Sequence, residues 1–445
     1  QDLGQLISSL AGDFHPPLHY LFMHYWLKIG IIQEWFLRLP NILLSVGAIY
    51  LLYLLFKKAL GDKTPKLVIG PVSLNLPAVA ALFLALNPLH IYYSQELRMF
   101  APSVFLVTAS WYFLISAQKN GKANLVFWAL ANALGLYTYY LSGFNILSQL
   151  IYLFIVDKKL FKKFIPWTFL TAVSFLPWLP TFIKQTQGGQ YLVEALPNWS
   201  QLSGDLSLKN AALIPVKFTL GRVNISSDDY YLLATVTSLL YIFSLMALSL
   251  FQKLSRLFWL WLIVPLVIGI ALSFKIPMLG YWRYLFLLPA FSSLLAIGIF
   301  HLPAKLGMVN IALLSVTFLF SNLLFWTTPS FHRENWQQAT DFVLQKQDQQ
   351  SVAVFAFPEP FAPVRWYAPK LNAKGALSDL TIDPQELDLN LSQITTGKDT
   401  IYYFEYLSEI TDPKDNIPAW LNNAGYDQAQ IYNFNGVGFV YQYQH

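Results

Sequence analysis

The chain has 445 residues, of which 55% are hydrophobic, 17% aromatic and only 12% charged, whereas soluble domains carry about 25% charged residues. So few charges cannot cover a soluble globule of this length, and the composition predicts a protein embedded in lipid. The net charge of +5 does not indicate a nucleic-acid partner, because residues 327–445 hold 7 Lys and Arg against 14 Asp and Glu while the other residues hold 22 against 10. The sequence therefore predicts a basic membrane part followed by an acidic soluble part. No disulfide can stabilise the soluble part, since the chain has no cysteine.

The first 35 residues predict an external segment with interfacial helices. Residues 13–17 read Asp-Phe-His-Pro-Pro, and prolines are favoured at the start of a helix. The apolar and aromatic run 18–30 that follows also bears two histidines and a lysine, which is typical of a helix lying on the membrane surface. We interpret Asp13 either as the N-cap of that helix or as a carboxylate held at the membrane surface beside the His15 imidazole.

Ten uncharged stretches predict a transmembrane domain over residues 36–326, because a spanning helix needs about 17–25 apolar residues. The stretches are 39–56, 67–87, 99–117, 124–140, 141–156, 164–182, 230–251, 257–274, 284–300 and 306–326. The loops after the odd-numbered stretches hold 13 Lys and Arg, so they are predicted to be cytoplasmic. The chain is then a multi-pass protein of the cytoplasmic membrane with its N-terminus outside. An external N-terminus without a translocation signal implies a further helix upstream of Gln1, so we expect the sequence to be a fragment.

Few charges remain on the outer side of this membrane part. Glu96 and Arg98 stand where a stretch enters lipid, and charges there usually face a cavity or a partner, although they can also anchor a helix by snorkelling. Arg283 and Tyr284 enter the ninth stretch. Aromatic residues beside an arginine are common in membrane belts, and a guanidinium there is also suited to hold a lipid phosphate through two hydrogen bonds.

Two further regions are predicted outside the cytoplasm. The long loop 183–229 exceeds the length of an ordinary connection and is expected to act as a lid or binding loop. Residues 327–445 predict a small α/β domain with a helix at 333–346, strands at 351–357, 400–406, 429–434 and 436–443, and a helix near 418–424. Trp336, Ala339, Phe342 and Val343 share one face of the first helix. This domain is expected to shape specificity and not to carry the reaction.

The motifs taken in order resemble the GT-C glycosyltransferases, specifically the protein O-mannosyltransferase-like and aminoarabinose-transferase-like branch. They are D-x-H-P-P-L, E-x-x-x-R-L-P at 34–40, S-Q-E-L-R-M-F at 94–100, W-R-Y-L-F-L-L-P at 282–289 and a charged-x-x-Trp pattern at 333–336. The sequence departs from the family at three points. The family's principal catalytic acid would precede Gln1, Phe100 replaces the usual Tyr, and Tyr139-Tyr140 stands where many relatives carry a His.

The resemblance implies an integral-membrane enzyme that passes a sugar, with inversion, from a polyprenyl-phosphate-linked donor to a protein, lipid or glycan acceptor. Such transfer needs a base at the acceptor hydroxyl and cations where phosphate charge develops. We assign Arg98, Arg283 and Tyr284 to the lipid phosphate and Glu96 to the orientation of Arg98. Asp13 and His15 would line the acceptor side or assist the base. No cofactor is demanded; a Mg or Mn ion would find its protein ligand in Asp13 but would need more oxygen ligands than the sequence identifies.

Other functions stay open. A transporter or flippase of a lipid-linked sugar or small solute would share the membrane setting, but transporters tend to carry polar or broken helices near the bilayer midplane, and all ten stretches lack charge. An envelope glycan polymerase or ligase would share the carrier. A non-enzymatic scaffold would leave the paired charges at the helix mouths without a role.

Overall fold

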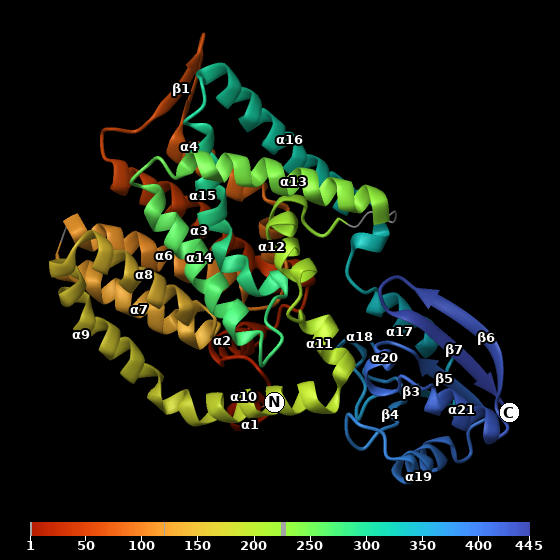
Figure 1. Ribbon diagram of the computed structural model, residues 1–445. Coiled ribbons are helices and arrows are strands. Elements are labelled where there is room, and N and C mark those ends of the chain that lie inside the picture. Colours follow the sequence, from red (N-terminus) through yellow and green to blue (C-terminus); the bar gives the residue numbers. More distant parts are fainter. Residues whose placement is uncertain (1, 120, 224–227) are drawn as a thin grey trace. The chain divides into compact units, whose positions relative to one another are not determined.

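The computed structural model describes residues 2–119, 121–223 and 228–445, and the chain divides into two compact units. The first unit comprises Gln1–Gln190 and Ser203–Leu324, and the second comprises Tyr191–Leu202 and Phe325–His445. Figure 1 shows that the first unit is built of helices with one β-hairpin, whereas the second combines helices with a sheet.

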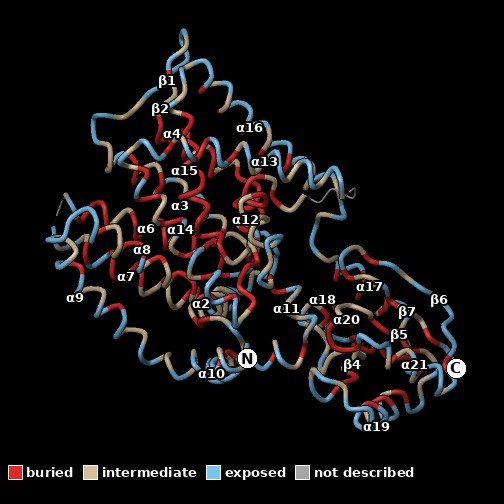
Figure 2. Tube along the Cα trace, viewed as in Figure 1, coloured by how far each residue is buried: buried red, intermediate tan, exposed pale blue. Residues whose placement is uncertain are grey.

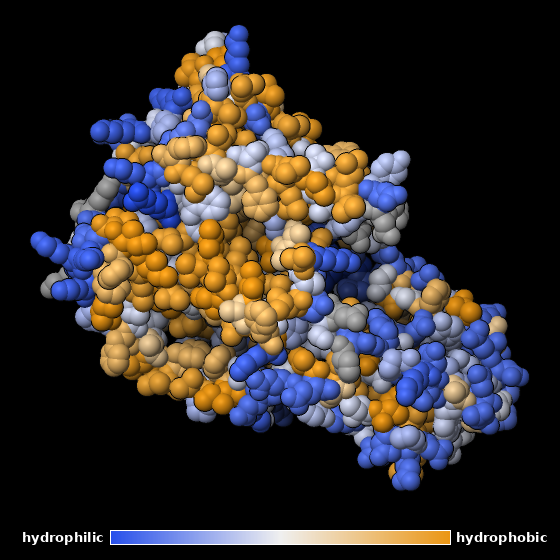
Figure 3. All heavy atoms as spheres, in the orientation of Figure 1, coloured by the Kyte–Doolittle hydropathy of each residue, from blue (hydrophilic) through white to orange (hydrophobic). Residues whose placement is uncertain are grey.

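The helices of the first unit largely follow the apolar stretches of the sequence. In chain order they are α1 (Leu3–Ala11), α2 (Leu18–Leu27), α3 (Glu34–Leu60), α4 (Leu76–Leu86), α5 (Pro88–Ser94), α6 (Phe100–Lys119), α7 (Lys122–Thr138), α8 (Ser142–Val156), α9 (Lys158–Phe175), η1 (Leu176–Trp178), α10 (Leu179–Ala195), α12 (Leu208–Leu220), α13 (Asp228–Ser249), α14 (Ser255–Leu272), η2 (Tyr281–Leu287), α15 (Leu288–Ile299) and α16 (Ala304–Thr327). Hydrophobic side chains dominate the face of this unit seen in Figure 3.

Six helical segments in the described part of the chain are long and apolar enough to cross a membrane. They are Glu34–Leu60, Phe100–Gln118, Asp229–Ser249, Ser255–Leu272, Tyr281–Ile299 and Ala304–Thr327, and a seventh results if α4 and α5, bent by 59°, form one broken span. The chain is thus a multi-pass membrane protein, but the count of ten spans is not confirmed. Three of the expected stretches do not meet these criteria in the structure. Two of them correspond to α7 and α8, which are short at 17 and 15 residues, and the third corresponds to α9, whose first two turns carry four lysines.

The expected stretch 67–87 is wrong in its first half. Strands β1 (Lys66–Ile69) and β2 (Val72–Asn75) form an antiparallel hairpin in which Ile69 pairs with Val72, and α4 begins only at Leu76. The turn between them is Gly70-Pro71, where Gly70 adopts a φ of 55°, a conformation open mainly to glycine. β-Branched residues flank this turn, so hydropathy alone could not separate the hairpin from a helix.

The region 183–229 is not an irregular loop. The end of α10, α11 (Pro197–Ser203) and α12 make most of it helical, while residues 224–227 lie outside the described residues. Residues 191–202 belong to the second unit. The role of this region as a lid stays a prediction.

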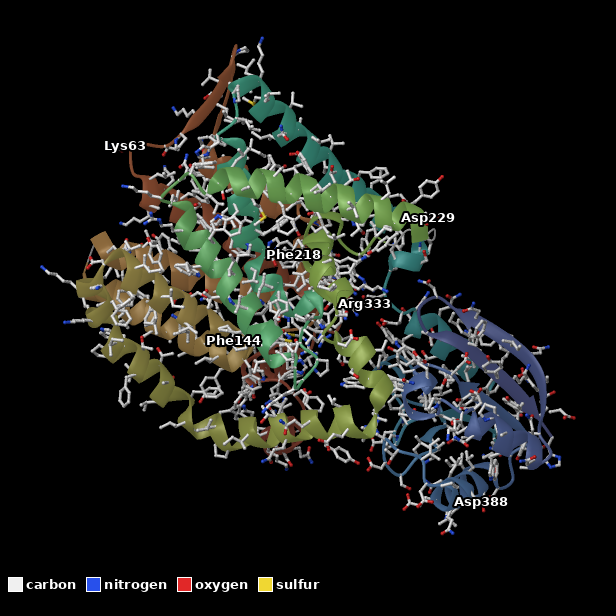
Figure 4. All side chains as sticks on the ribbon, in the orientation of Figure 1. Lys63, Phe144, Phe218, Asp229, Arg333 and Asp388 are labelled. Atoms are coloured by element: carbon white, nitrogen blue, oxygen red, sulfur yellow. The ribbon has the colours of Figure 1, made fainter. Side chains whose placement is uncertain are left out.

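Helix α15 is the core of the first unit, because every one of its twelve residues is buried (Figure 2). Small residues allow this close packing: a Cβ on Gly298 would lie 1.8 Å from the carbonyl oxygen of Leu245 in α13. Figure 4 likewise shows Phe218 of α12 inside the unit, and the Phe218 carbonyl accepts a hydrogen bond of 2.7 Å from Asn87. Because η2 leads directly into α15, the core fixes the segment that bears Arg283 and Tyr284.

Buried polar side chains join α6, α7 and α8. The Gln149 amide in α8 donates to Ser110 Oγ (2.6 Å) and accepts from the Trp128 indole (2.7 Å) and from Asn132 (3.2 Å). Interhelical hydrogen bonds of this kind hold membrane helices together, since lipid offers no hydrophobic driving force between them.

The second unit is a five-stranded sheet between two layers of helices. The strand order is β4-β3-β5-β7-β6; β3 is parallel to β4 and β5, and β7 is antiparallel to β5 and β6. The elements are η3 (Pro329–Phe331), α17 (Trp336–Lys346), β3 (Ser351–Phe355), α18 (Ala362–Tyr367), β4 (Ala373–Gly375), α19 (Pro384–Thr395), β5 (Thr400–Phe404), α20 (Ser408–Thr411), α21 (Asn416–Asn423), β6 (Asp427–Phe434) and β7 (Gly438–Gln444).

The two faces of this sheet have separate cores. The predicted face of α17 packs on one of them, where Trp336, Ala339 and Val343 join Phe355 and Phe404. α19 and α21 cover the other face. The four predicted strands correspond to β3, β5, β6 and β7, and β4 was not foreseen because it has only three residues.

Candidate functional site

Asp13 does not cap α2. The N-cap of that helix is Pro17, which makes no side-chain bond, because two prolines separate Asp13 from the first helical turn. Asp13 Oδ1 instead accepts the Phe14 amide at 2.6 Å and lies 3.2 Å from His15 Nδ1, and the Tyr20 hydroxyl also hydrogen-bonds the carboxyl. Burial raises the pKa of Asp13, but these partners outweigh it and hold the pKa below its usual 3.8. Of the two interpretations of Asp13, the structure therefore contains the Asp13 carboxylate beside the His15 imidazole and not the N-cap.

Helix α10 holds the segment that carries this pair. Gln185 Nε2 donates to the carbonyls of Leu10 (2.7 Å) and His15 (3.3 Å). Gln185 Oε1 in turn accepts from the Tyr140 hydroxyl at 2.5 Å. Tyr140, one of the two tyrosines at the family's His position, thus helps to fix the segment around Asp13.

The turn that bears Glu96 and Arg98 joins α5 to α6. The amide of Asn41, in α3, donates to the carbonyls of Glu96 and Arg98, the latter at 3.0 Å, and the His19 ring hydrogen-bonds the main chain of Leu97. Glu96 is buried, with 8% of its surface exposed, whereas Arg98 is exposed and its guanidinium lies 5.0 Å from the centre of the Phe100 ring. The orientation of Arg98 by Glu96 stays a prediction.

Arg283 and Tyr284 lie in η2, at the entrance to the core helix. Arg283 is half-buried. Tyr284 is fully buried, and a Cβ added to Gly269 of α14 would lie 1.7 Å from its hydroxyl oxygen. The contact of this hydroxyl with a lipid phosphate stays a prediction, because the ring would have to move to make it.

The structure brings these separate segments together around Tyr139. The Tyr139 ring lies 6.0 Å from that of Phe100 and 6.3 Å from that of Phe286, and both Arg98 and Arg283 act electrostatically on its hydroxyl. Tyr20 lies close to both Asp13 and Arg98, because both charges act electrostatically on its hydroxyl. Asp13, Arg98 and Arg283 therefore belong to one neighbourhood although they lie far apart in the sequence.

Burial sets the protonation of His19, directly behind this site. Burial lowers the pKa of His19 to about 4, and the nearby Arg98 guanidinium and His15 ring lower it further, against the hydrogen bond to Leu97. At neutral pH the imidazole is therefore uncharged and places no further positive charge beside Arg98.

Sequence reasoning missed several of these residues. His19 and Tyr20 stand in an aromatic run with no pattern that distinguishes them. Tyr139 had one signal, because Tyr139-Tyr140 stands where many relatives of the resembling family carry a His. Asn41 had a usable signal, because it is an amide within an apolar span directly after Pro40. Arg222 was not selected from the sequence; its guanidinium lies 4.7 Å from the centre of the Tyr92 ring and donates to the Tyr92 hydroxyl.

A divalent cation finds few protein ligands in this neighbourhood. Within the described residues, no three His, Cys, Asp or Glu side chains gather as a metal site. Asp13 Oδ1 already accepts the Phe14 amide and contacts His15. Mg²⁺ can be bound by one or two carboxylates together with substrate phosphates and waters, so Asp13 could supply at most one protein ligand, and no step below is assigned to a metal.

The fold defines a multi-pass membrane protein, and Arg98 and Arg283 lie near Tyr139 in its first unit. Residues 14–183 match the family described as Dolichyl-phosphate-mannose-protein mannosyltransferase. This match confirms the resemblance to GT-C membrane glycosyltransferases over those residues, which include Arg98 but not Asp13 or Arg283. No curated protein matches the chain.

Solved structures show remote likenesses. The arabinofuranosyltransferase AftD from Mycobacteria is 13% identical with a TM-score of 0.48, and the comparison covers 92% of this chain but only 33% of that one. This chain thus spans about a third of the AftD chain. ArnT from Cupriavidus metallidurans, bound to undecaprenyl phosphate, is 13% identical with a TM-score of 0.40, covering 97% of this chain and 88% of ArnT. At these values the likenesses add nothing to the family match.

Proposed function

We propose that the protein is an inverting glycosyltransferase that moves a sugar from a polyprenyl-phosphate-linked donor to an acceptor on the extracytoplasmic side of the membrane. The observation that carries this proposal is the convergence of the Arg98 and Arg283 segments on Tyr139. The family match over residues 14–183 supports the reaction class. The basic loops between helices support the orientation, with the C-terminal unit outside the cytoplasm.

The two arginines would stabilise the leaving group. Transfer breaks the bond between the anomeric carbon and the phosphate oxygen, so negative charge develops on the departing lipid phosphate. A guanidinium is always protonated and can bind two phosphate oxygens at once. Arg98 and Arg283, with Arg222 beside Tyr92, would hold that charge.

Asp13 would act on the acceptor side. Its lowered pKa keeps the carboxylate ionised at neutral pH, so it can accept a hydrogen bond from the acceptor hydroxyl and orient it. The same low pKa makes it a weak base. We therefore assign Asp13 and His15 to orientation of the acceptor and to assistance of proton removal.

The test is the release of polyprenyl phosphate by the purified protein in lipid nanodiscs that contain a polyprenyl-phosphate sugar. Arg283→Ala should lower turnover by about a hundredfold, the usual effect of removing one group that stabilises transition-state charge. Arg256→Ala, which removes an exposed arginine at the start of α14, is the control and should be active. Equal turnover in the two variants would end the role of Arg283.

One observation favours the transporter alternative. The bend of 59° between α4 and α5 resembles the broken helices from which transporters build their binding sites. A flippase would move the labelled donor across the bilayer without releasing polyprenyl phosphate. Translocation without release would therefore replace the glycosyltransferase by a transporter.

A further inference from the structure

We infer that Asn41 is a positioning residue, which holds the Glu96–Arg98 turn so that the Arg98 guanidinium faces the lipid phosphate. This inference rests on the proposed function. The Asn41 side chain lies inside a membrane helix, and its proposed role is to act through Arg98 without touching the reacting groups.

The main chain of the turn is held from two helices. The Asn41 amide of α3 donates to the carbonyls of Glu96 and Arg98, and His19 of α2 binds the main chain of Leu97 between them. Asn41 and His19 are buried, with 1% and 5% of their surfaces exposed. Three consecutive residues are thus attached to the interior of the first unit, while the Arg98 side chain remains exposed.

The position of Asn41 follows from its helix. Asn41 lies on the buried face of α3 together with Ser45, Ala48 and Leu52, at the three- and four-residue spacings of one helical face. Its side chain must therefore point into the unit, where water is scarce. A buried donor or acceptor left without a partner destabilises the folded protein, so the amide and the two carbonyls stabilise each other's placement.

The turn needs such support because it lies outside regular structure. α5 ends at Ser94 and α6 begins at Phe100, so the residues between them lack a helical ladder of hydrogen bonds. A displacement of about 1 Å in a group that orients substrate can cost about a hundredfold in rate. Without Asn41, Arg98 would sample positions away from the phosphate.

Asn41→Leu tests the inference because leucine has the same number of side-chain heavy atoms, branched at the same carbon, and no donor. Asn322→Leu is the matched control: Asn322 is also buried in a span and donates to a carbonyl of another helix, that of Leu86, at 2.9 Å. We expect Asn41→Leu to raise the KM for the polyprenyl-phosphate sugar by about tenfold or more, and Asn322→Leu to leave that KM unchanged. A merely structural defect would lower the amount of folded protein, and hence the apparent kcat, with KM constant.

A spin label reports on the turn without any activity. The chain has no cysteine, and the Leu97 side chain is 41% exposed, so Leu97→Cys gives one labelling site on the turn. The label should become more mobile in the Asn41→Leu background and not in the Asn322→Leu background. If Asn41→Leu fails to fold, Asn41→Ser, which keeps one donor, should change both readouts in the same direction by less.

Two results would overturn the inference. A label that stays equally immobile after Asn41→Leu would show that Asn41 does not hold the turn. A mobile label with the same donor KM as in Asn322→Leu would show that holding the turn does not position Arg98. If the wild-type protein transfers no sugar, the proposed function fails, whereas the label still decides whether Asn41 holds the turn.

Discussion

A buried imidazole lies directly behind the exposed guanidinium of Arg98, and its protonation links the site to pH. The pKa of His19 is about 4 in the folded protein and 6.5 in the unfolded chain. Between these values the unfolded chain binds more protons, so the contribution of His19 to stability is fully present above pH 6.5 and is lost as the pH falls towards 4. The whole effect amounts to about 3 kcal/mol at most.

Thermal unfolding between pH 4.5 and 7.5 checks this prediction. His19→Gln keeps a donor for Leu97 but cannot titrate, so the stability of this variant should fall less steeply with acid than that of the wild type. His332→Gln changes an exposed histidine of the second unit and should keep the wild-type slope. Parallel slopes for wild type and His19→Gln would contradict the prediction.

The backbone of Gly269 packs directly against the Tyr284 hydroxyl, which leaves no room for a side chain at position 269. Because a Cβ on Gly269 would lie 1.7 Å from the Tyr284 hydroxyl, Gly269→Ala should destabilise the protein by about 1–3 kcal/mol through overpacking. The double variant Gly269→Ala, Tyr284→Phe should recover part of the loss, since it removes the clashing oxygen. Gly188→Ala, with its nearest atom at 3.6 Å, is the control. Melting temperatures in one detergent decide the matter, and equal losses in the single and double variants would contradict it.

The polar bonds among α6, α7 and α8 set the stability of those helices. Gln149→Leu would leave the Trp128 indole, the Asn132 amide and Ser110 without their bonds to Gln149. Membrane hydrogen bonds contribute about 0.6–2 kcal/mol each, so the variant should unfold at a clearly lower temperature. Asn310→Leu, which removes one bond from Tyr241 and one to the Leu306 carbonyl on a more exposed surface, should have less effect; a reversed order would contradict the argument.

Helices and strands were predictable where the apolar pattern of the sequence continued without interruption over the whole element. α13, α14 and α16 follow their apolar stretches closely, and the four predicted strands are found because they alternate or are continuously apolar. The stretch 67–87 failed because Gly70-Pro71 makes a turn that hydropathy averages away. The sequence singles out Arg98 and Arg283 as candidate site residues because each charge stands against lipid, and their role in binding phosphate stays a prediction. Local sequence can mark Asn41 and Tyr139 as unusual, but it does not record which distant segments they and His19 contact.

At the scale of the whole molecule, the second unit includes a segment far from the rest of its sequence. Leu192 and Leu196 pack with Ile410 in a small core of their own, and Asn198 donates to the Glu409 carbonyl at 2.9 Å. Leu196→Asp would bury a charge there and should make the second unit sensitive to limited proteolysis, with a loss of about 2–4 kcal/mol. Leu202→Asp changes a residue of the same segment that is 47% exposed and should leave digestion unchanged. Equal digestion of the two variants would show that this core does not stabilise the unit.

During protein synthesis, residues 191–202 are made well before the residues that they pack against. Residues 191–202 leave the ribosome before Ser203–Leu324, and the strands that complete their unit follow only after Phe325. At about 5–20 residues per second, the interval is on the order of 10 s. During that time the apolar side chains of Leu192 and Leu196 lack their partners while the last spans are still entering the bilayer. The second unit can therefore complete this small core only after its C-terminal residues have been made.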